Sequence, residues 1–404
     1  MPYLIDIVNL NADASCLSSK WWLKILSGGK SSYFYKWLKI YVDAGKKVSI
    51  GFTGAAIADI STFNPEAIEF INNHRNIFEI ILRPFSHDVG LLRSTKGFQI
   101  NLEAGIKTIK HTFSTYTNFY LPPEFMLTNE QVAILVDNKI DGTFINAARF
   151  KTEIFQRLPE HPYKVKGLFD SELRCIPFTG ALTQAFLNGI HFFNADEWNK
   201  LVAADSSSKQ PSATATATAT FFSWRDGESS FLIPNGNSRE QAWLKAESKQ
   251  VQRIFLSETL PEMEFDNSDN LKENHYHHYP IHSFTAWMKE FRMIGFVNKI
   301  LDFEKNISKM QPDEIALWLQ VINSDILSSV EKDSPVIKLK LKEGEKKVSD
   351  YTIWRCERGM EGEEILLLLE EGLNNKKIKT YLKKSDSPHI QKLKARIEYL
   401  KKII

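Results

Sequence analysis

The sequence has few cysteines and no long apolar run. Among its 404 residues are three cysteines, Cys16, Cys175 and Cys356, which lie far apart. Their positions match neither the spacing of a zinc site nor that of a disulfide framework. This absence excludes a small disulfide-stapled fold and favours a reducing compartment, so we expect a cytoplasmic protein. No segment approaches the roughly 20 consecutive apolar residues that a membrane-spanning helix needs.

Net charge is also nearly absent, at +2. Such a chain has no overall electrostatic attraction to nucleic acid or to a membrane surface. The first residues lack the basic start and apolar core of a signal peptide, and residues 2–8 are typical of a strand instead. We find no phosphate-binding loop, no Ser-His-Asp elbow and no nucleic-acid-binding module. The composition, with 43% hydrophobic and 25% charged residues, is that of a globular domain.

Strand and helix patterns alternate through the first 150 residues. Short apolar runs at 4–8, 48–52, 78–82, 118–121 and 142–145 predict strands. Helical spacing predicts helices at 32–44, from 64 onward, at 103–113 and at 128–138. Strands joined by helices favour parallel βαβ units, so we predict an α/β fold built on an open parallel sheet or a barrel.

The second half continues this pattern and then changes character. Residues 176–178 and 220–224 predict strands, 237–252 a helix, and 282–307 and 311–330 long amphipathic helices. The pattern at residues 206–220 predicts a loop followed by an Ala-Thr stretch. That stretch either continues into the next strand or is a linker. We therefore predict a barrel domain over 1–280, a helical region over 281–334 that packs on it, and a Lys/Glu-rich helical tail over 335–404.

The tail contains one apolar stripe. Its members, at spacings of three and four, are Ile390, Leu393, Ile397, Leu400 and Ile404. A stripe of this kind packs on the body of the protein or on a partner. A basic face toward a membrane or nucleic acid is the weaker alternative, since lysine runs are usually solvated helix faces.

The segment 119–124 carries the most distinctive chemistry. An apolar strand ends there in Leu121, two prolines and Glu124. Pro122 and Pro123 cannot continue a central strand, so Glu124 is predicted at the mouth of a strand, where α/β folds place their catalytic groups. The alternative is a surface turn that happens to carry a glutamate.

Several segments together resemble glycoside hydrolase family 57. They are the aromatic-Leu-Pro-Glu stretch at 119–124, the strand segments at 47–54 and 78–87, the Asp-Gly-Glu segment at 226–228, and the helical residues 287–304 and 317–325. The resemblance covers about residues 1–330 and implies a (β/α)7-type barrel followed by a helical C-terminal region. It also implies a retaining glycosidase or transglycosylase that acts on α-linked glycans. The chain departs from the family at Asn9-Leu10-Asn11, where a His-x-His segment is usual, and at the extra Pro123.

The resemblance assigns roles to particular residues. Glu124 is the expected nucleophile and Asp226 the expected acid/base, since retaining hydrolysis needs two carboxyl groups about 5–5.5 Å apart. Trp224 and Tyr120 either stack on sugar rings or belong to the core. The expected substrate-binding set is Asn9, Asn11, Asp13, Glu79, His87, Tyr120, Trp224 and Glu228. We expect an oligo- or polysaccharide substrate and neither a metal nor a cofactor.

Two other functions stay open. One is a barrel that binds a saccharide without cleaving it and uses the Lys-rich tail to dock a partner protein or a second copy. The other is a metal-dependent polysaccharide deacetylase, for which Asp6, Asp13 and His87-Asp88 are present but a His-x3-His pair is not. Four of the ten histidines lie in residues 274–282, where they form either a zinc site or a plain loop.

Overall fold

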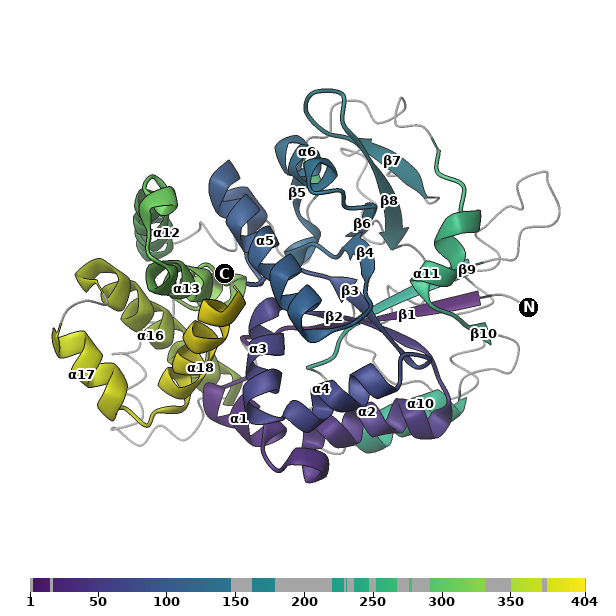
Figure 1. The fold of residues 1–404 in the computed structure, drawn as a ribbon, viewed down its shortest axis with the longest axis horizontal. Helices are drawn as coiled ribbons and strands as arrows, with labels where there is room; N and C mark the ends of the chain where they lie inside the picture. Colours follow the sequence, from purple (N-terminus) through teal and green to yellow (C-terminus); the bar gives the residue numbers. More distant parts are fainter. Residues whose placement is uncertain are drawn as a thin grey trace.

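The structure is a computed structural model of all 404 residues. It describes residues 3–14, 17–146, 162–178, 220–228, 230, 236–246, 252–266, 276–277, 291–330, 350–372 and 376–403. A nine-stranded sheet forms the middle of the molecule, and helices lie on its outside and beyond one of its ends (Figure 1).

The strands of the sheet follow the predicted runs closely. They are β1 (Tyr3–Leu10), β2 (Val48–Phe52), β3 (Phe78–Leu82), β4 (Thr117–Tyr120), β6 (Gly142–Asn146), β7 (Tyr163–Lys166), β8 (Glu172–Phe178), β9 (Thr220–Asp226) and β10 (Gln252–Arg253). Strands β9, β1, β2, β3, β4, β6 and β8 pair in parallel in that order, while β7 pairs antiparallel with β8 and β10 pairs with β1. A separate antiparallel pair joins β5 (Leu127–Thr128) to β11 (Tyr276–His277).

The two faces of the sheet have separate cores. Even-numbered residues of β1, such as Leu4 and Val8, pack under the helices, whereas Ile5 and Ile7 belong to an inner cluster. That inner cluster also contains Ile81, Phe119, Phe144, Phe178 and Trp224. Because side chains alternate along a strand, each strand supplies one row to each core.

Helices connect the parallel strands. They are α1 (Ser19–Leu26), α2 (Tyr33–Ala44), α3 (Gly54–Phe63), α4 (Pro65–Asn73), α5 (Thr95–Thr112), α6 (Asn129–Asp137), α10 (Gly236–Ala246) and the short α11 (Leu256–Thr259). The predicted signals hold for α2, where Ser32 caps the start and Gly45 ends the helix in a left-handed conformation. Thr128 caps α6 in a reciprocal pair with Gln131.

Two predicted helices have different bounds. The helix predicted from residue 103 starts at Thr95, because the Ser94 side chain accepts a hydrogen bond from the Gly97 amide and caps the chain there. The helix predicted over 311–330 is two helices, α13 (Pro312–Val321) and α14 (Ser324–Ser329). The break falls at Asn323, whose side chain accepts from the Asp325 amide and starts the second helix.

The C-terminal helices lie beside the sheet domain (Figure 1). They are α12 (Phe291–Glu304), α16 (Asp350–Glu371), α17 (Lys376–Lys384) and α18 (Pro388–Ile403). One of them, α18, contacts α1, α3 and α5. The stripe residues Ile390, Leu393, Ile397 and Leu400 are buried in one cluster with residues of α12, α13 and α14. The apolar stripe of the tail therefore packs on the body of the same chain. The domain boundaries proposed at 280 and 334 fall outside the described residues, so they stay predictions.

Two further predictions concern segments of which the structure describes little. The loop and Ala-Thr stretch at 206–219 lies outside the described residues, and of the histidine segment only Tyr276 and His277 are described. Within the described ranges, no helix has the length and apolarity to cross a bilayer.

Candidate active site

Strand alternation brings several polar side chains to one place. On the inner face of the sheet, the apolar row of β1, Ile5 and Ile7, ends in Asn9. The row of β9, Phe222 and Trp224, ends in Asp226. The row of β3 passes from Ile81 to Arg83, which lies just beyond the strand. Asn9 and Asp226 are direct neighbours in the parallel register of β1 and β9. The apolar inner rows thus end in polar groups at the carboxyl ends of the strands, where parallel α/β folds bind their ligands.

Glu124 lies in a strained turn next to this group. It follows Pro122 and Pro123, and its φ of 53° and the φ of 54° at Phe125 are both left-handed. Only glycine adopts this conformation without strain, and each such residue costs about 1–3 kcal/mol. The additional proline is thus accommodated by a turn whose strain falls on the carboxylate-bearing residue and its neighbour.

The Glu124 carboxylate is contacted by side chains from two parts of the chain, Ser324 and His87. Ser324 Oγ donates a hydrogen bond to Oε1 over 3.0 Å. His87 Nε2 lies 3.3 Å from the same oxygen. His87 follows β3, and Ser324 starts α14, so the sheet and the helical region jointly hold Glu124.

Asp226 is the second carboxylate of the site. Asn9 Nδ2 donates to its Oδ1 over 2.9 Å. Solvent reaches the Asp226 side chain, yet desolvation by the surrounding protein raises its pKa. The hydrogen bond from Asn9 and the charge of His87 lower this pKa, whereas the charges of Glu124 and Asp325 raise it further. Asp226 therefore holds a proton more readily than an ordinary aspartate.

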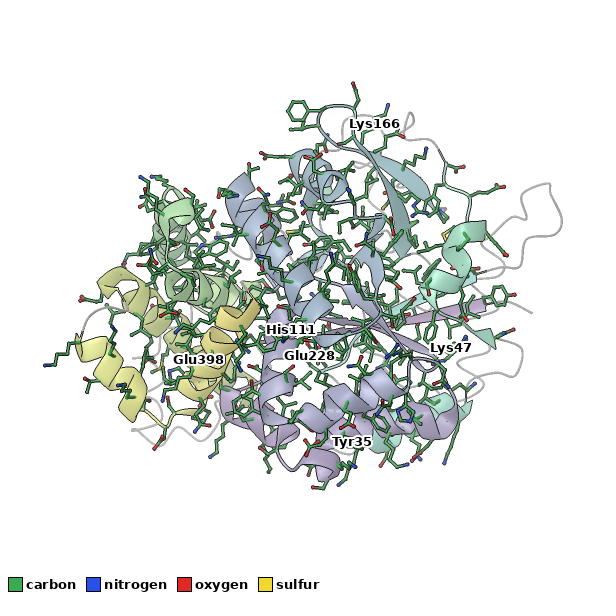
Figure 2. The ribbon with its side chains drawn as sticks, viewed as in Figure 1. Tyr35, Lys47, His111, Lys166, Glu228 and Glu398 are labelled. Atoms are coloured by element: carbon green, nitrogen blue, oxygen red, sulfur yellow. The ribbon has the colours of Figure 1, made fainter. Side chains whose placement is uncertain are left out.

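Glu228, labelled in Figure 2, lies two residues further on and is buried. The Asn11 amide donates to its Oε1. Burial, and then the charge of Asp226, raise the pKa of Glu228 well above its usual range. The Asp-Gly-Glu segment therefore contributes two carboxyl groups whose pKa values are raised.

Sequence reasoning missed the contribution of the α13–α14 connection. The Ser324 amide donates to the His87 carbonyl over 2.7 Å, and Asn11 Nδ2 donates to Asp325 Oδ2 over 2.8 Å. These contacts join the α13–α14 connection to the residues that follow β1 and β3. The Asn-Ser-Asp start of a helix was the available signal, since those residue types cap helices with their polar side chains.

Arg83 was also missed. It is 1% exposed, and its Nη2 contacts His87 Nδ1 over 2.9 Å. Its position two residues after Ile81, on the inner row of β3, was the signal.

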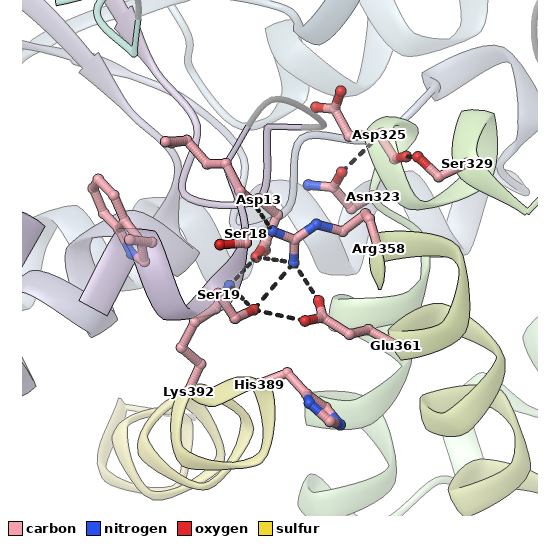
Figure 3. Close-up of polar contacts among 12 residues, drawn as sticks. Asp13, Ser18, Ser19, Asn323, Asp325, Ser329, Arg358, Glu361, His389 and Lys392 are labelled. Carbon is pink, nitrogen blue, oxygen red and sulfur yellow. Dashed lines mark hydrogen bonds and ion pairs between the residues drawn. The ribbon is translucent and has the colours of Figure 1, made fainter. Parts of the chain in front are cut away.

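Asp13 does not join the site, which corrects its assignment to the sugar-binding set. Its buried carboxylate accepts from Arg396 at 2.6 and 3.1 Å and from Lys392 at 2.7 Å. Figure 3 shows Arg358 reaching between Asp13, Ser19 and Glu361. These cations hold the Asp13 pKa well below its usual range despite burial. Asp13 thus ties the end of β1 to α16 and α18.

Glu79 also lies elsewhere. It is the second residue of β3, at the amino end of the strand, and accepts from Ser49 Oγ over 2.6 Å. The amides of Leu256 and Ser257, at the start of α11, each donate to it over 3.0 Å. Its carboxylate is therefore occupied by a helix N-terminus on the side away from Glu124.

The two aromatic candidates are core residues. Tyr120 is fully buried and belongs to the cluster beneath the helices, edge-on to Phe98. Trp224 is 9% exposed and packs edge-on against Phe125, with ring centroids 5.1 Å apart. The stacking role proposed for either ring does not fit these positions. Trp224 instead supports the turn that carries Glu124.

Asp88, beside His87, gives a prediction about stability. Burial raises its pKa to about 6, against the charge of Arg93. Between about pH 4 and pH 6 the folded protein keeps a proton that the unfolded chain has lost, so stability falls as the pH rises through this window. An asparagine does not titrate. At pH 7.5 we expect Asp88→Asn to unfold with a free energy higher than wild type by up to about 3 kcal/mol.

Urea unfolding at several pH values checks this expectation. The advantage of the variant should shrink toward zero below about pH 4. Asp302→Asn, at a side chain that is 68% exposed, is the matched control and should show no such pH dependence. An equal difference between Asp88→Asn and wild type at pH 4 and pH 7.5 contradicts the assignment.

The metal-binding alternatives depend on a cluster of ligating side chains. Among the residues that the structure describes, no group of three or more His, Cys, Asp or Glu is arranged to hold a metal ion. Most of segment 274–282 is not described, so the zinc and deacetylase alternatives stay predictions.

Comparison with known proteins identifies the fold. No protein-family model matches the sequence, and no curated protein matches it. A GH57 branching enzyme from Thermococcus kodakaraensis matches with a TM-score of 0.60 and 11% identity, over 100% of this chain and 96% of the other. A GH57-type branching enzyme from Pyrococcus horikoshii matches with a TM-score of 0.56 and 10% identity, over 98% and 95% of the two chains.

A third solved structure extends the comparison. The 4-α-glucanotransferase from Thermococcus litoralis matches with a TM-score of 0.53 and 15% identity, over 84% of this chain. The match spans only 54% of the glucanotransferase. At these identities the likeness concerns the fold. It confirms the predicted α/β class, a parallel sheet of the (β/α)7 type followed by helices, which this chain shares with glycoside hydrolase family 57 enzymes.

Proposed function

We propose that this chain is a divergent member of glycoside hydrolase family 57 that hydrolyses or transfers α-linked glycosyl units with retention of configuration. Glu124 is the nucleophile and Asp226 the acid/base. The observation that carries the proposal is that both carboxylates lie at the carboxyl ends of parallel strands, where the charge of Glu124 acts on Asp226. Glu124 is held at a strained strand end by His87 and Ser324, and its charge helps to raise the pKa of Asp226.

The proposed reaction is a double displacement. A Glu124 carboxylate oxygen attacks the anomeric carbon while Asp226 gives its proton to the departing glycosidic oxygen, and the first sugar leaves as a neutral alcohol. Asp226 then takes a proton from water or from an acceptor hydroxyl, whose oxygen displaces Glu124 from the anomeric carbon. The raised pKa of Asp226 favours the protonated form that the first step needs.

Asn9 and Asn11 serve the site in a way that fits the departure from His-x-His. Asn9 orients the Asp226 carboxyl, and Asn11 joins Glu228 to Asp325 through its amide and its side chain. Both residues lie on the strand end and hold carboxyl groups in place. Amides supply these hydrogen bonds without adding a charge that titrates near neutral pH.

The substrate class comes from the shared fold. The solved relatives are named as branching enzymes and a 4-α-glucanotransferase, so an α-glucan is the first substrate to test. A non-catalytic saccharide-binding barrel is the runner-up, because Asn replaces His at the first strand end. In that alternative the exposed face of the tail docks a partner protein or a second copy.

The experiment is incubation of the full chain with maltooligosaccharides of defined length, followed by chromatography and by proton NMR of the new reducing ends. We expect shortened or lengthened products whose first-formed anomer is α. A first-formed β-anomer would contradict the retaining mechanism. Sugar binding without any product would favour the saccharide-binding alternative, and acetate release from acetylated oligosaccharides only after addition of zinc would favour the deacetylase.

A further inference from the structure

Three side chains form a line from β3 to the Glu124 turn. Arg83 Nη2 lies 2.9 Å from His87 Nδ1, and His87 Nε2 lies 3.3 Å from Glu124 Oε1. Arg83 is 1% and His87 8% exposed. The contacts use opposite nitrogens of one imidazole ring, so the proton on that ring depends on what each neighbour can donate or accept.

Arg83 decides the assignment. A guanidinium group has only donors, so the Nδ1 atom that faces it must accept. An accepting Nδ1 carries no proton, which leaves the single proton of the neutral ring on Nε2. The carboxylate of Glu124 only accepts, and it faces Nε2.

We infer that Arg83 is a positioning residue that selects the Nε2–H tautomer of His87 and thereby directs the ring proton toward the Glu124 carboxylate. The part of the inference that concerns catalysis rests on the proposed role of Glu124 as nucleophile. The tautomer itself follows from the contacts alone and can be measured without any substrate.

The charge state of Arg83 supports this reading. Burial lowers its pKa to about 10, against the charges of Glu228, Asp226 and Glu124. The guanidinium is thus protonated at neutral pH. A proton on Nδ1 would point at this cation, so the geometry places the ring proton on Nε2.

The sequence around Arg83 keeps it in place. Gly51 is the fourth residue of β2, and a Cβ atom there would lie 2.8 Å from a Leu121 methyl and 3.0 Å from Arg83 Cδ. Arg83 Nη1 also donates to the Gly51 carbonyl over 3.4 Å. A glycine in a strand interior weakens the strand, and here it provides the space through which Arg83 reaches the site.

A neutral donor has a specific benefit for a carboxylate nucleophile. The Ser324 hydroxyl donates a hydrogen bond to Oε1, and His87 Nε2 lies 3.3 Å from the same oxygen, so both groups bear on the orientation of the Glu124 carboxylate. An imidazolium in the same place would form an ion pair, which stabilises the ground-state carboxylate that has to lose its charge in the attack. Arg83 thus orients Glu124 without that penalty.

The test is spectroscopic. In full-length protein labelled with ¹⁵N-histidine, long-range proton–nitrogen correlation at pH 7.5 reports the tautomer of each ring. His87→Gln assigns the His87 signals. We expect a pyridine-like Nδ1 and a pyrrole-like Nε2 for His87 in the wild type. A pyrrole-like Nδ1, or a doubly protonated ring, would overturn the inference.

Substitution of Arg83 tests the cause. Arg83→Met keeps much of the packing and removes the donor, so the His87 signals should shift toward a mixture of tautomers, while Arg83→Lys should retain the wild-type tautomer. Unchanged His87 signals in Arg83→Met would also overturn the inference. If Arg83→Met does not fold, Gly51→Ala displaces Arg83 by contact and is expected to perturb the same signals.

Kinetics then separate the two proposals. On a glycan that the wild type turns over, Arg83→Met should lower kcat by about 10- to 100-fold with a smaller change in KM, because orientation of the nucleophile is lost. A wild type that holds the Nε2–H tautomer without cleaving glycans refutes the proposed function and keeps the tautomer assignment. A wild type that cleaves glycans but holds the Nδ1–H tautomer refutes the tautomer assignment and keeps the proposed function.

Discussion

Glu124→Gln is expected to lower turnover by at least about 10⁴-fold while sugar affinity stays near that of the wild type. The amide keeps the size of the side chain and its hydrogen bond from Ser324. It lacks the negative charge that attacks the anomeric carbon, so the covalent step fails while binding survives. Turnover on maltooligosaccharides and calorimetric titration with the same sugars measure the two effects.

A chemical rescue makes this expectation specific. Glu124→Gly leaves a gap that azide can enter, so added sodium azide should restore turnover and yield a glycosyl azide of β configuration. Residue 124 has a left-handed φ of 53°, which glycine adopts readily, so this variant should fold. Glu262→Gln, at an exposed glutamate, is the matched control. Unchanged turnover in Glu124→Gln would end the nucleophile assignment.

Asp13→Asn is expected to lower the free energy of unfolding by about 3–5 kcal/mol. Asp13 is 3% exposed and is ion-paired with Arg396, Lys392 and Arg358. Removal of its charge leaves buried cations with too little compensation. Because Asn11 lies two residues before Asp13, the variant should also disturb the site. Urea unfolding at pH 7.5 gives the stability difference.

The pH dependence provides a second readout. The folded-state pKa of Asp13 is depressed, so its contribution is fully present above about pH 4, the ordinary aspartate value, and is lost as the pH falls through the folded-state pKa. The difference between wild type and Asp13→Asn should therefore be constant from pH 5 to pH 8. Asp43→Asn, where the carboxylate is 53% exposed, should change stability by less than about 1 kcal/mol. An equally small effect at Asp13 would refute the prediction.

The strands could be predicted because their signals are local. The runs at 48–52 and 78–82 match β2 and β3 residue for residue, and Gly45 and Thr128 mark helix ends where predicted. Helix bounds were less accurate where a cap was overlooked. Ser94 extends α5 by two turns toward its start, and Asn323 divides the helix predicted over 311–330.

Site residues divide according to strand parity. Asn9 and Asp226 lie on the inner rows and at the carboxyl ends, and they reach the site. Tyr120 lies one residue from the inner row of β4, which turns it toward the helices. Glu79 lies on the inner row of β3 but at the wrong end. A residue needs both the right parity and the right end, and a motif match specifies neither.

The sequence by itself determined the α/β class, the order of strands and helices, and the carboxylates at 124, 226 and 228, because periodicity, proline and caps act over a few residues. Only the tertiary structure decided that Ser324, Asp325 and Arg83 complete the candidate site. It also decided that Asp13 forms buried ion pairs with residues of α16 and α18. The contacts of Ser324, Asp325 and Asp13 join residues some 200 to 380 positions apart, such as Ser324 with Glu124 and Arg396 with Asp13. No local pattern records such pairings, since they arise when chain segments that are independent in sequence bury polar groups that must find partners.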